Sequence, residues 1–368
     1  MTKRSGRIGV MAAGLPVALA AGFLISPRGQ WWVAHEYQRL CFQWIADRIT
    51  QGAPNTQTSV ARLLEYVHDN LHPVGTPVDV EPQEILASGR GWCDQQANVF
   101  IQLARSVPLD GRLVFLHDAT GESPHSIAEV YLDGAWRVVD PLLGVAIVNG
   151  EGRLATREDI AREPQLLADE PRLRMLTTFG STTDFAAMAN WYEHGPTIFN
   201  TWRGKRKTWF DQCPPWLRRR LLWVTQDVYL LSPMAGKGFS RSQRWLLRAR
   251  HYELLGRSRE AIRLYQRLMR EANDATVKDD ARFFLGQLYE AEGRAEEALA
   301  TFQLALRESP SGKWTPFTRA ALGRLYEQLG QPTLALQAYE SSQLMQVEPL
   351  VGQRVMMLRA HRMPEGPS

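Results

Sequence analysis

The sequence predicts an α+β domain followed by an all-α repeat region, and three patterns support this prediction. A stretch with one apolar helical face begins at Cys93, and two β-prone runs flank the dipeptide Asp133-Gly134. Further along the chain, small and aromatic residues recur every 37 positions. A helix packed on an antiparallel sheet accounts for the first two patterns, and a helical solenoid accounts for the third.

The composition is that of a folded chain with two or three domains. Hydrophobic residues make up 44% of the 368 residues, which is enough for sizeable cores. The formal net charge of +4 is mild and no basic helix with nucleic-acid chemistry is evident, so we expect no nucleic-acid partner. The histidines and cysteines show no metal-ligand spacing, and we expect neither a metal nor another cofactor.

Residues 1–27 are predicted to be a membrane anchor. The run from Ile8 to Ile25 is uncharged and follows three cations, which favours a cytoplasmic N-terminus and a spanning segment. A cleaved signal peptide is the alternative, because residues 18–20 have the small-x-small pattern. We favour the anchor since the apolar run continues beyond that point. This predicts a single-pass protein of the inner membrane with its bulk on the periplasmic side.

Two helices are predicted before the Cys93 stretch. Apolar residues follow one stripe across residues 30–52, within a juxtamembrane region that spans 28–56, and a shorter stripe covers about 57–71. Outside the cytoplasm Cys41 and Cys213 are available to form a disulfide. Two unpaired thiols are the simpler expectation for these cysteines.

Cys93 is a candidate nucleophile because of its place in the predicted helix. Gly89 and Gly91 permit a sharp turn just before it, so the cysteine falls in the first helical turn. Unpaired N–H groups and the positive end of the helix dipole favour the thiolate there. A small buried residue that packs well is the alternative for an isolated cysteine.

The predicted hairpin brings a histidine and an aspartate to one face of the sheet. A two-residue turn at 133–134 pairs Leu132 with Ala135, and the same register places His125 one diagonal step from Asp140. A slip of one residue would separate them onto opposite faces. We therefore expect Asp140 to orient the imidazole, and His125 to take the thiol proton and deliver it to a leaving amine.

His117 is a rival for His125 as the base. It lies at the end of a predicted strand, residues 112–117, and has no acid at a comparable pairing position. We therefore interpret His117 as a strand-end residue.

The order of Cys93, His125 and Asp140 resembles the transglutaminase-like superfamily, which has a papain-like core. The resemblance covers about residues 60–145, and Pro108 departs from it where the family usually has glycine. The other matching positions are Leu86, Gly89, Arg90, Gly91, Ala97, Phe100, Leu103, Arg105, Gly111, Arg112, Leu113, Val114, Glu129, Trp136 and Pro141. The resemblance implies attack on amide bonds of a peptide or protein through a thioester, in a domain spanning 57–156.

Two neighbours of Cys93 complete the predicted site. Backbone N–H groups of Cys93 and Asp94 point out of the helix start and are candidate oxyanion donors. Trp92 is expected to form a wall of the cleft.

Residues 157–241 are predicted to be a helical connector rich in tryptophan. Tryptophans mixed with cations suit either an anionic membrane surface or a linker whose rings pack between two domains. We expect the linker, because aromatic rings are usually buried. The tryptophans are Trp191, Trp202, Trp209, Trp216 and Trp223.

Residues 242–349 resemble three tetratricopeptide repeats, with a capping helix and tail over 350–368. Three sets of residues are 37 apart, and they suit close helix pairing and an aromatic filler between units. These sets are Gly256, Gly293 and Gly330; Ala261, Ala298 and Ala335; Tyr265, Phe302 and Tyr339.

Equivalent positions on the concave side of the repeats hold Arg250, Gln287 and Arg324. Two arginines there are candidates to clamp the carboxylate of a partner peptide, and solvated surface charge is the alternative. The resemblance to tetratricopeptide repeats implies that this module recruits a protein partner.

Together these patterns predict a membrane-anchored, extracytoplasmic cysteine hydrolase or acyltransferase with a partner-binding module. The alternative is a scaffold for envelope or polysaccharide assembly, in which the Cys93 domain is a structural platform without activity. The two hypotheses differ in whether Cys93 is reactive.

Overall fold

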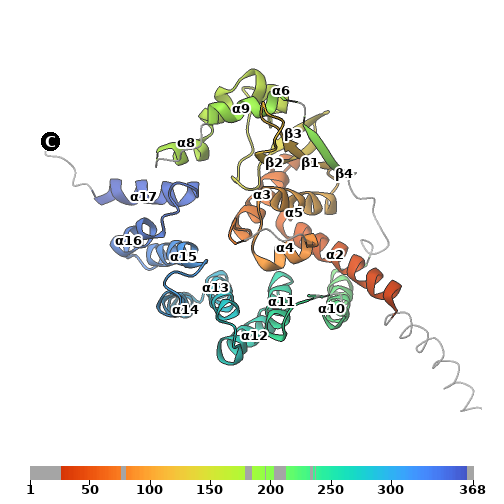
Figure 1. The fold of residues 1–368 in the computed structure, drawn as a ribbon, viewed down its shortest axis with the longest axis vertical. Coiled ribbons are helices and arrows are strands. Elements are labelled where there is room, and N and C mark those ends of the chain that lie inside the picture. Colours follow the sequence, from red (N-terminus) through yellow and green to blue (C-terminus); the bar gives the residue numbers. More distant parts are fainter. Residues whose placement is uncertain are drawn as a thin grey trace, which may run out of the picture.

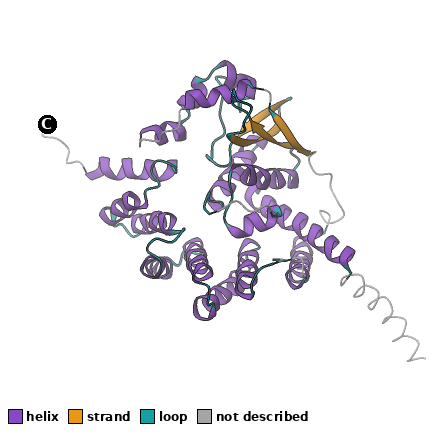
Figure 2. Ribbon diagram, in the orientation of Figure 1, coloured by secondary structure: helices purple, strands orange, loops and turns teal. Residues whose placement is uncertain are grey.

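The computed structural model describes residues 26–75, 80–178, 185–194, 196–202, 213–232, 235–236 and 238–362. Figure 1 shows helices and a small sheet in one half of the molecule and a curved row of helices in the other. Figure 2 shows that the strands gather in one place, with helices around them. The predicted combination of an α+β domain and a helical C-terminal region is confirmed.

The first two described helices, α2 (Pro27–Thr50) and α3 (Thr56–Asn70), confirm the stripes predicted over 30–52 and 57–71. The buried side chains of α2 recur at helical spacing, and this face packs on α5 and α10. Asn55 caps α3 by accepting a hydrogen bond from the Thr58 amide at 2.8 Å.

The expected single-pass membrane location is not supported and is corrected here. Among residues 26–75, 80–178, 185–194, 196–202, 213–232, 235–236 and 238–362, each helix is too short or too polar to cross a bilayer. The apolar run that suggested an anchor, residues 8–25, lies outside the described residues.

The sheet is antiparallel with strand order β3, β2, β1, β4. Its first three strands are β1 (Gly111–Leu116), β2 (His125–Leu132) and β3 (Ala135–Val139). Leu132 pairs with Ala135, as predicted, because Asp133 and Gly134 both take positive φ, 52° and 79°, in a two-residue turn. The helix α5 (Cys93–Ser106) packs on one face of β1 and β2, where it shares a core with α2 and α3.

The other face of the sheet is covered by short helices from the region predicted to be a helical connector. They are α6 (Arg157–Arg162), α7 (Gln165–Asp169), α8 (Pro171–Thr178) and α9 (Phe185–Glu193). The prediction missed β4 (Thr197–Trp202), which pairs with β1 and forms one edge of the sheet. Part of this region is therefore a component of the α+β domain and not a linker.

The last helix of this region, α10 (Pro215–Leu231), packs beside α2. The ring centroid of Trp223 is 4.4 Å from the guanidinium of Arg219 in the same helix and 5.4 Å from that of Arg257, which follows α11. Trp216 is 66% exposed. One of these rings therefore packs between segments, as the linker interpretation expects, and the other does not.

Three antiparallel helix pairs follow, and their turns match the predicted repeat. Gly256, Gly293 and Gly330 follow the first helix of each pair with φ of 73°, 71° and 68°, a conformation that glycine adopts without strain. The pairs are α11 (Arg241–Leu254) with α12 (Ser258–Glu271), α13 (Ala275–Ala291) with α14 (Ala295–Glu308), and α15 (Thr315–Gln328) with α16 (Pro332–Ser342).

Small residues let the helices of each pair approach closely. A Cβ atom on Gly286 would overlap the Phe302 ring, and one on Gly323 would overlap the Tyr339 ring. Each aromatic ring is buried, at 0% and 1% exposure. The 37-residue spacing of small and aromatic residues therefore reflects direct contact between the two helices of the second and third pairs.

The row of repeats curves back onto the α+β domain. Figure 1 shows α11, α13 and α15 on the inner side of the curve and α12, α14 and α16 on the outer side. At one end α11 packs on α4 (Pro82–Ser88), and at the other α17 (Pro349–Arg362) packs on α8. His72, just after α3, inserts among aromatic rings of the inner side, with its ring centroid 4.2 Å from that of Phe317.

None of Cys41, Cys93 and Cys213 forms a disulfide. The structure therefore does not contain the Cys41–Cys213 bridge that was weighed above. Burial raises the pKa of Cys41 to about 12, so this thiol stays protonated.

Candidate functional site

Cys93 is the first residue of α5, at the end of a tight loop. Gly89 ends α4 in the left-handed conformation, with φ of 65°, and the chain then turns back toward the strand-like segment at His72. His72 donates its amide to the Gly89 carbonyl at 3.1 Å and accepts the Gly91 amide at 3.0 Å. These backbone bonds fix the loop from which Cys93 projects.

Two glutamines hold the start of α5, and sequence reasoning assigned them no role. Gln95 accepts the Trp92 amide through Oε1 at 3.1 Å, and Gln96 donates Nε2 to the Gly91 carbonyl at 2.8 Å. Gln96 is fully buried. The signal was present, because a glutamine three residues after a helix N-cap is the usual partner of the N-cap amide.

The predicted oxyanion donors and cleft wall occupy this same helix start. The Trp92 carbonyl accepts the Gln96 amide at 2.8 Å, which is the first bond of the α5 helix. The amides of Cys93 and Asp94 precede it and have no carbonyl partner within the helix. The Trp92 indole is 39% exposed and donates to the Gly75 carbonyl at 3.2 Å.

His125 and Asp140 meet as the hairpin register requires. His125 is the first residue of β2, and Asp140 directly follows β3, so the two lie one diagonal step apart on one face. The imidazole Nε2 is 2.6 Å from the Asp140 Oδ2. The second carboxylate oxygen accepts the Leu143 amide at 3.1 Å, which fixes the orientation of the acid.

Cys93 and His125 influence each other's ionisation. Burial alone would raise the pKa of the Cys93 thiol, but the hydrogen bond and charge of His125, with the Ser126 amide, lower it overall. Burial alone would lower the pKa of His125, but the charge and hydrogen bond of Asp140, together with Cys93, raise it to about 10. The arrangement therefore favours a thiolate beside an imidazolium.

The helix α9 covers the histidine on the far face of the sheet. Its Trp191 ring centroid is 6.4 Å from that of His125, and Tyr192 is buried beside it. Burial, and then the nearby charges of Asp140 and Glu129, raise the pKa of Tyr192 far above its ordinary value. His125 and Asp140, at 7% and 2% exposure, are thus largely shielded from water.

A buried carboxylate, Glu129, lies on the same face of β2 as His125. It accepts Arg157 Nε at 2.9 Å and also Arg112 Nε, whose guanidinium lies 4.2 Å from the Trp136 ring centroid. Two arginines therefore neutralise this charge close to the site. Sequence reasoning matched Glu129 and Trp136 to a family pattern but did not predict this cluster.

His117, the rival base, lies apart from Cys93. Its Nδ1 faces the Gly121 carbonyl at 3.0 Å, and its Nε2 faces the Thr197 hydroxyl at 2.9 Å, in an exposed setting. The structure therefore brings together Cys93, His125 and Asp140, whereas His117 lies at the strand end.

The three residues proposed as a partner clamp do not form one site. Arg250 is 3% exposed and bonds within its own chain, to Glu253 at 2.8 Å and to the Ala87 carbonyl at 2.9 Å. Gln287 and Arg324 line a separate cavity on the inner side of the repeats, and Arg324 pairs with Glu290 at 2.8 Å. The interpretation of Arg250 as a residue that binds a partner is therefore wrong, because it joins the repeats to α4.

Comparison with known protein families agrees with this geometry. The model of the transglutaminase-like superfamily matches residues 43–141, a span that contains Cys93, His125 and Asp140. A tetratricopeptide repeat model matches residues 246–313, and repeats of this kind suggest interaction between proteins. No curated protein and no solved structure matched the chain. The predicted resemblance to both families is confirmed.

Proposed function

We propose that this chain is a cysteine enzyme that opens amide bonds through a thioester. One observation carries the proposal: Cys93, His125 and Asp140 come from three separate segments and are arranged as a nucleophile, a base and an orienting acid. The superfamily that matches this region generally includes cysteine enzymes, which supports the same reaction class.

The bonding changes follow from the roles of the three groups. The Cys93 thiolate attacks the carbonyl carbon of the substrate, and a carbon–sulfur bond forms as the carbonyl oxygen becomes negative. The amides of Cys93 and Asp94 stabilise that oxygen at the helix start. The carbon–nitrogen bond then breaks, and the His125 imidazolium gives its proton to the leaving amine.

The thioester is resolved by a second nucleophile. His125, now neutral, takes a proton from water or from an amine as that molecule attacks the acyl carbon, and Cys93 leaves as the thiolate. Water makes the protein a peptidase or amidase, whereas an amine makes it an acyltransferase. Asp140 holds the imidazole in the same orientation for both steps.

The test is thiol labelling of the full chain with a fluorescent iodoacetamide at about pH 6, where an ordinary thiol is almost fully protonated. We expect one labelled residue, Cys93, and we expect labelling to be lost in Cys93→Ala and strongly slowed in His125→Ala. Cys213→Ser, which changes another partly exposed thiol, serves as the matched control and should label as the natural chain does.

Cys93 labelling no faster than that of Cys213, or unchanged in His125→Ala, would refute the proposal. The chain would then be a scaffold that keeps the transglutaminase-like fold without its chemistry.

A further inference from the structure

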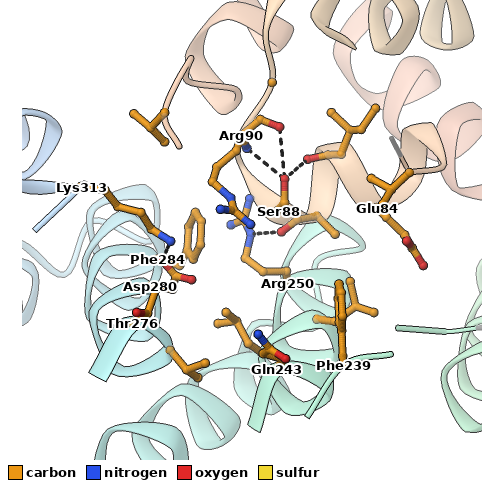
Figure 3. Close-up of a pocket in the computed structure, with 18 of the residues that line it drawn as sticks. Glu84, Ser88, Arg90, Phe239, Gln243, Arg250, Thr276, Asp280, Phe284 and Lys313 are labelled. Carbon is orange, nitrogen blue, oxygen red and sulfur yellow. Dashed lines mark hydrogen bonds and ion pairs between the residues drawn. The ribbon is translucent and has the colours of Figure 1, made fainter. Parts of the chain in front are cut away.

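A cavity of about 400 Å³ lies at the junction between the two halves of the chain. We call it the junction cavity. One wall is formed by α4 and the loop after it, including Ser88 and Arg90, and the other by α11 and α13, including Arg250 and Phe284 (Figure 3). Trp92 and Leu247 also line the cavity. Its volume is within the range of small-molecule sites, which occur preferentially between domains. Cys93 is not among its lining residues.

The acidic side chains of the junction cavity are already engaged. Asp280 accepts the Trp314 indole at 2.6 Å and the Lys313 ammonium at 2.7 Å. Asp274 caps α13 by accepting the Thr276 amide at 2.9 Å. Lys313 therefore neutralises the charge of Asp280, and Asp274 is engaged by the helix start.

The third acid, Glu84, is also partnered. It accepts the Tyr229 hydroxyl at 3.1 Å, and burial raises its pKa. Burial favours the neutral form of this carboxyl, so Glu84 is a weak partner for a ligand cation.

Arg90 differs from these residues. Its backbone bonds to the Ser88 hydroxyl, but its guanidinium has no hydrogen-bond or ion-pair partner among the residues that the structure describes. Figure 3 shows the Arg90 side chain extending toward Phe284 and Arg250. The Arg250 guanidinium stacks on Phe284 at 3.9 Å and is already paired with Glu253 at 2.8 Å, so Arg90 is the cation of this part of the cavity that a ligand can engage. Planar guanidinium groups bind carboxylates through two parallel hydrogen bonds.

The remaining lining is mostly apolar. Ile85 comes from α4, Leu246 and Leu247 come from α11, and Val277 comes from α13, beside Phe284. A ligand that satisfies Arg90 would therefore place an apolar body against these side chains.

We propose that the junction cavity binds small organic carboxylates that carry an apolar body, with the carboxylate on Arg90 and the body against Leu247 and Phe284. The site is separate from Cys93 and does not depend on the proposed enzymatic activity. It is formed jointly by the transglutaminase-like region, which supplies Arg90, and the repeats, which supply Leu247 and Phe284.

Three probes with the same apolar body test this proposal by calorimetry on the full chain: 4-phenylbutyrate, 4-phenylbutan-1-ol and 4-phenylbutylammonium. We expect the carboxylate to bind roughly tenfold or more tightly than the alcohol, as a charge-assisted hydrogen bond provides, and the ammonium to bind least. In Arg90→Gln the preference for the carboxylate should disappear, whereas Arg90→Lys should retain part of it.

Arg263→Gln is the matched control, because it removes the same charge from an exposed position on α12. It should bind 4-phenylbutyrate as the natural chain does. Equal affinities for the three probes, no binding of 4-phenylbutyrate at millimolar concentration, or unchanged carboxylate preference in Arg90→Gln would each overturn the proposal. Thermal melting of each variant verifies that the fold is retained.

Discussion

At the residue scale, the Cys93 thiol and the His125 imidazole have pKa values that shift in opposite directions. Burial opposes charge on both side chains, yet their mutual attraction and Asp140 favour the ionised form of each. Three local features place these groups. Cys93 begins a helix, the hairpin register positions His125, and Asp140 directly follows a strand.

The lowered pKa of Cys93 predicts a shifted pH profile. A thiol with a depressed pKa remains a thiolate as the pH falls below the ordinary value of about 8.5, so alkylation by iodoacetamide should persist through neutral pH. His125→Ala removes the group that lowers this pKa, and the midpoint of the profile should move upward. The rate of Cys93 alkylation between pH 5 and 9 measures both. An unchanged midpoint in the variant would contradict the assignment.

Asp140→Asn should weaken the same pair from its other side. The charge and hydrogen bond of Asp140 raise the pKa of His125, so without them this pKa should fall well below about 10. The Cys93 thiolate beside it should then be less stable. We expect turnover of an amide substrate to fall roughly 10²- to 10⁴-fold, and the alkylation midpoint to rise. Asp133→Asn makes the same chemical change in the turn of the hairpin and should leave both readouts unaltered.

How far the site was predictable depends on how local its causes are. Cys93, His125 and Asp140 followed from a helix stripe and a two-residue turn, which are short-range signals. The roles of Gln95 and Gln96 were missed, although Gln95 carries a recognisable capping position. The Glu129 cluster was out of reach, because Arg157 arrives from a helix on the far face of the sheet.

At the scale of elements, the hairpin was predicted with its register and β4 was not. Asp-Gly is a dipeptide that readily adopts positive φ at both positions, as Asp133 and Gly134 do. The two-residue turn then fixes the register of the hairpin. In contrast, β4 lies among tryptophans and cations in the sequence, and its strand form comes from pairing with β1. The sequence of a strand that forms only by pairing with a distant segment does not by itself predict a strand.

The close approach of helices in the second repeat predicts the effect of Gly286→Ala. The added methyl group would overlap the Phe302 ring, so α13 and α14 must move apart, and we expect a loss of about 1–3 kcal/mol in the free energy of unfolding. Denaturant unfolding measures this loss.

Gly150→Ala is the control for this substitution, because a Cβ atom there has no neighbour within 4 Å. It should change stability little. The first helix pair has an alanine, Ala249, at the equivalent position. Near-neutral behaviour of Gly286→Ala would therefore show that the second pair also accommodates a methyl group there.

At the scale of the whole molecule, a partly buried ion pair joins α3 to Glu348, the residue just before α17. His68 on α3 faces Glu348 through Nε2 at 3.0 Å and the Leu142 carbonyl through Nδ1 at 3.1 Å. Burial would lower the pKa of His68, but Glu348, and to a lesser degree Asp69, raise it against the opposing charge of Arg172. Burial would raise the pKa of Glu348, but His68 lowers it overall.

These shifts predict a pH window for the docking of α17. The His68 contribution is complete below its ordinary pKa of about 6.5 and is lost as the pH rises through its higher folded value. The Glu348 contribution is present above about pH 4.3 and is lost as the pH falls through its lower folded value. Amide exchange in α17 should therefore be slowest, after correction for intrinsic rates, between about pH 4.3 and 6.5.

Glu348→Gln should abolish this pH window. We expect amide exchange in α17 to quicken roughly fivefold near pH 6, which corresponds to about 1 kcal/mol for a partly shielded pair. Glu340→Gln breaks an exposed pair with Arg359 and should leave exchange almost unchanged. Equal effects of the two variants would show that His68 does not fasten the helix.

The repeat pattern predicted the helix pairs, but not where the row of repeats would lie. Gly286, Gly323 and their aromatic partners are set by contacts within each pair, so a fixed spacing reveals them. The insertion of His72 among Phe283, Trp314 and Phe317 depends on two surfaces far apart in sequence. Burial lowers the pKa of His72 to about 3, so it enters this apolar setting uncharged.

The helix α11 packs on α4, and α17 packs on α8. Both ends of the row of repeats therefore contact the α+β domain. Stacked repeats that stand alone unravel inward from a terminus, one unit after another. Here a terminal unit must first part from the neighbouring domain, and Gly89 in the loop before Cys93 lies directly against Phe284 of α13. We therefore expect heating to unfold the repeats and to abolish the reactivity of the Cys93 thiol in a single cooperative transition.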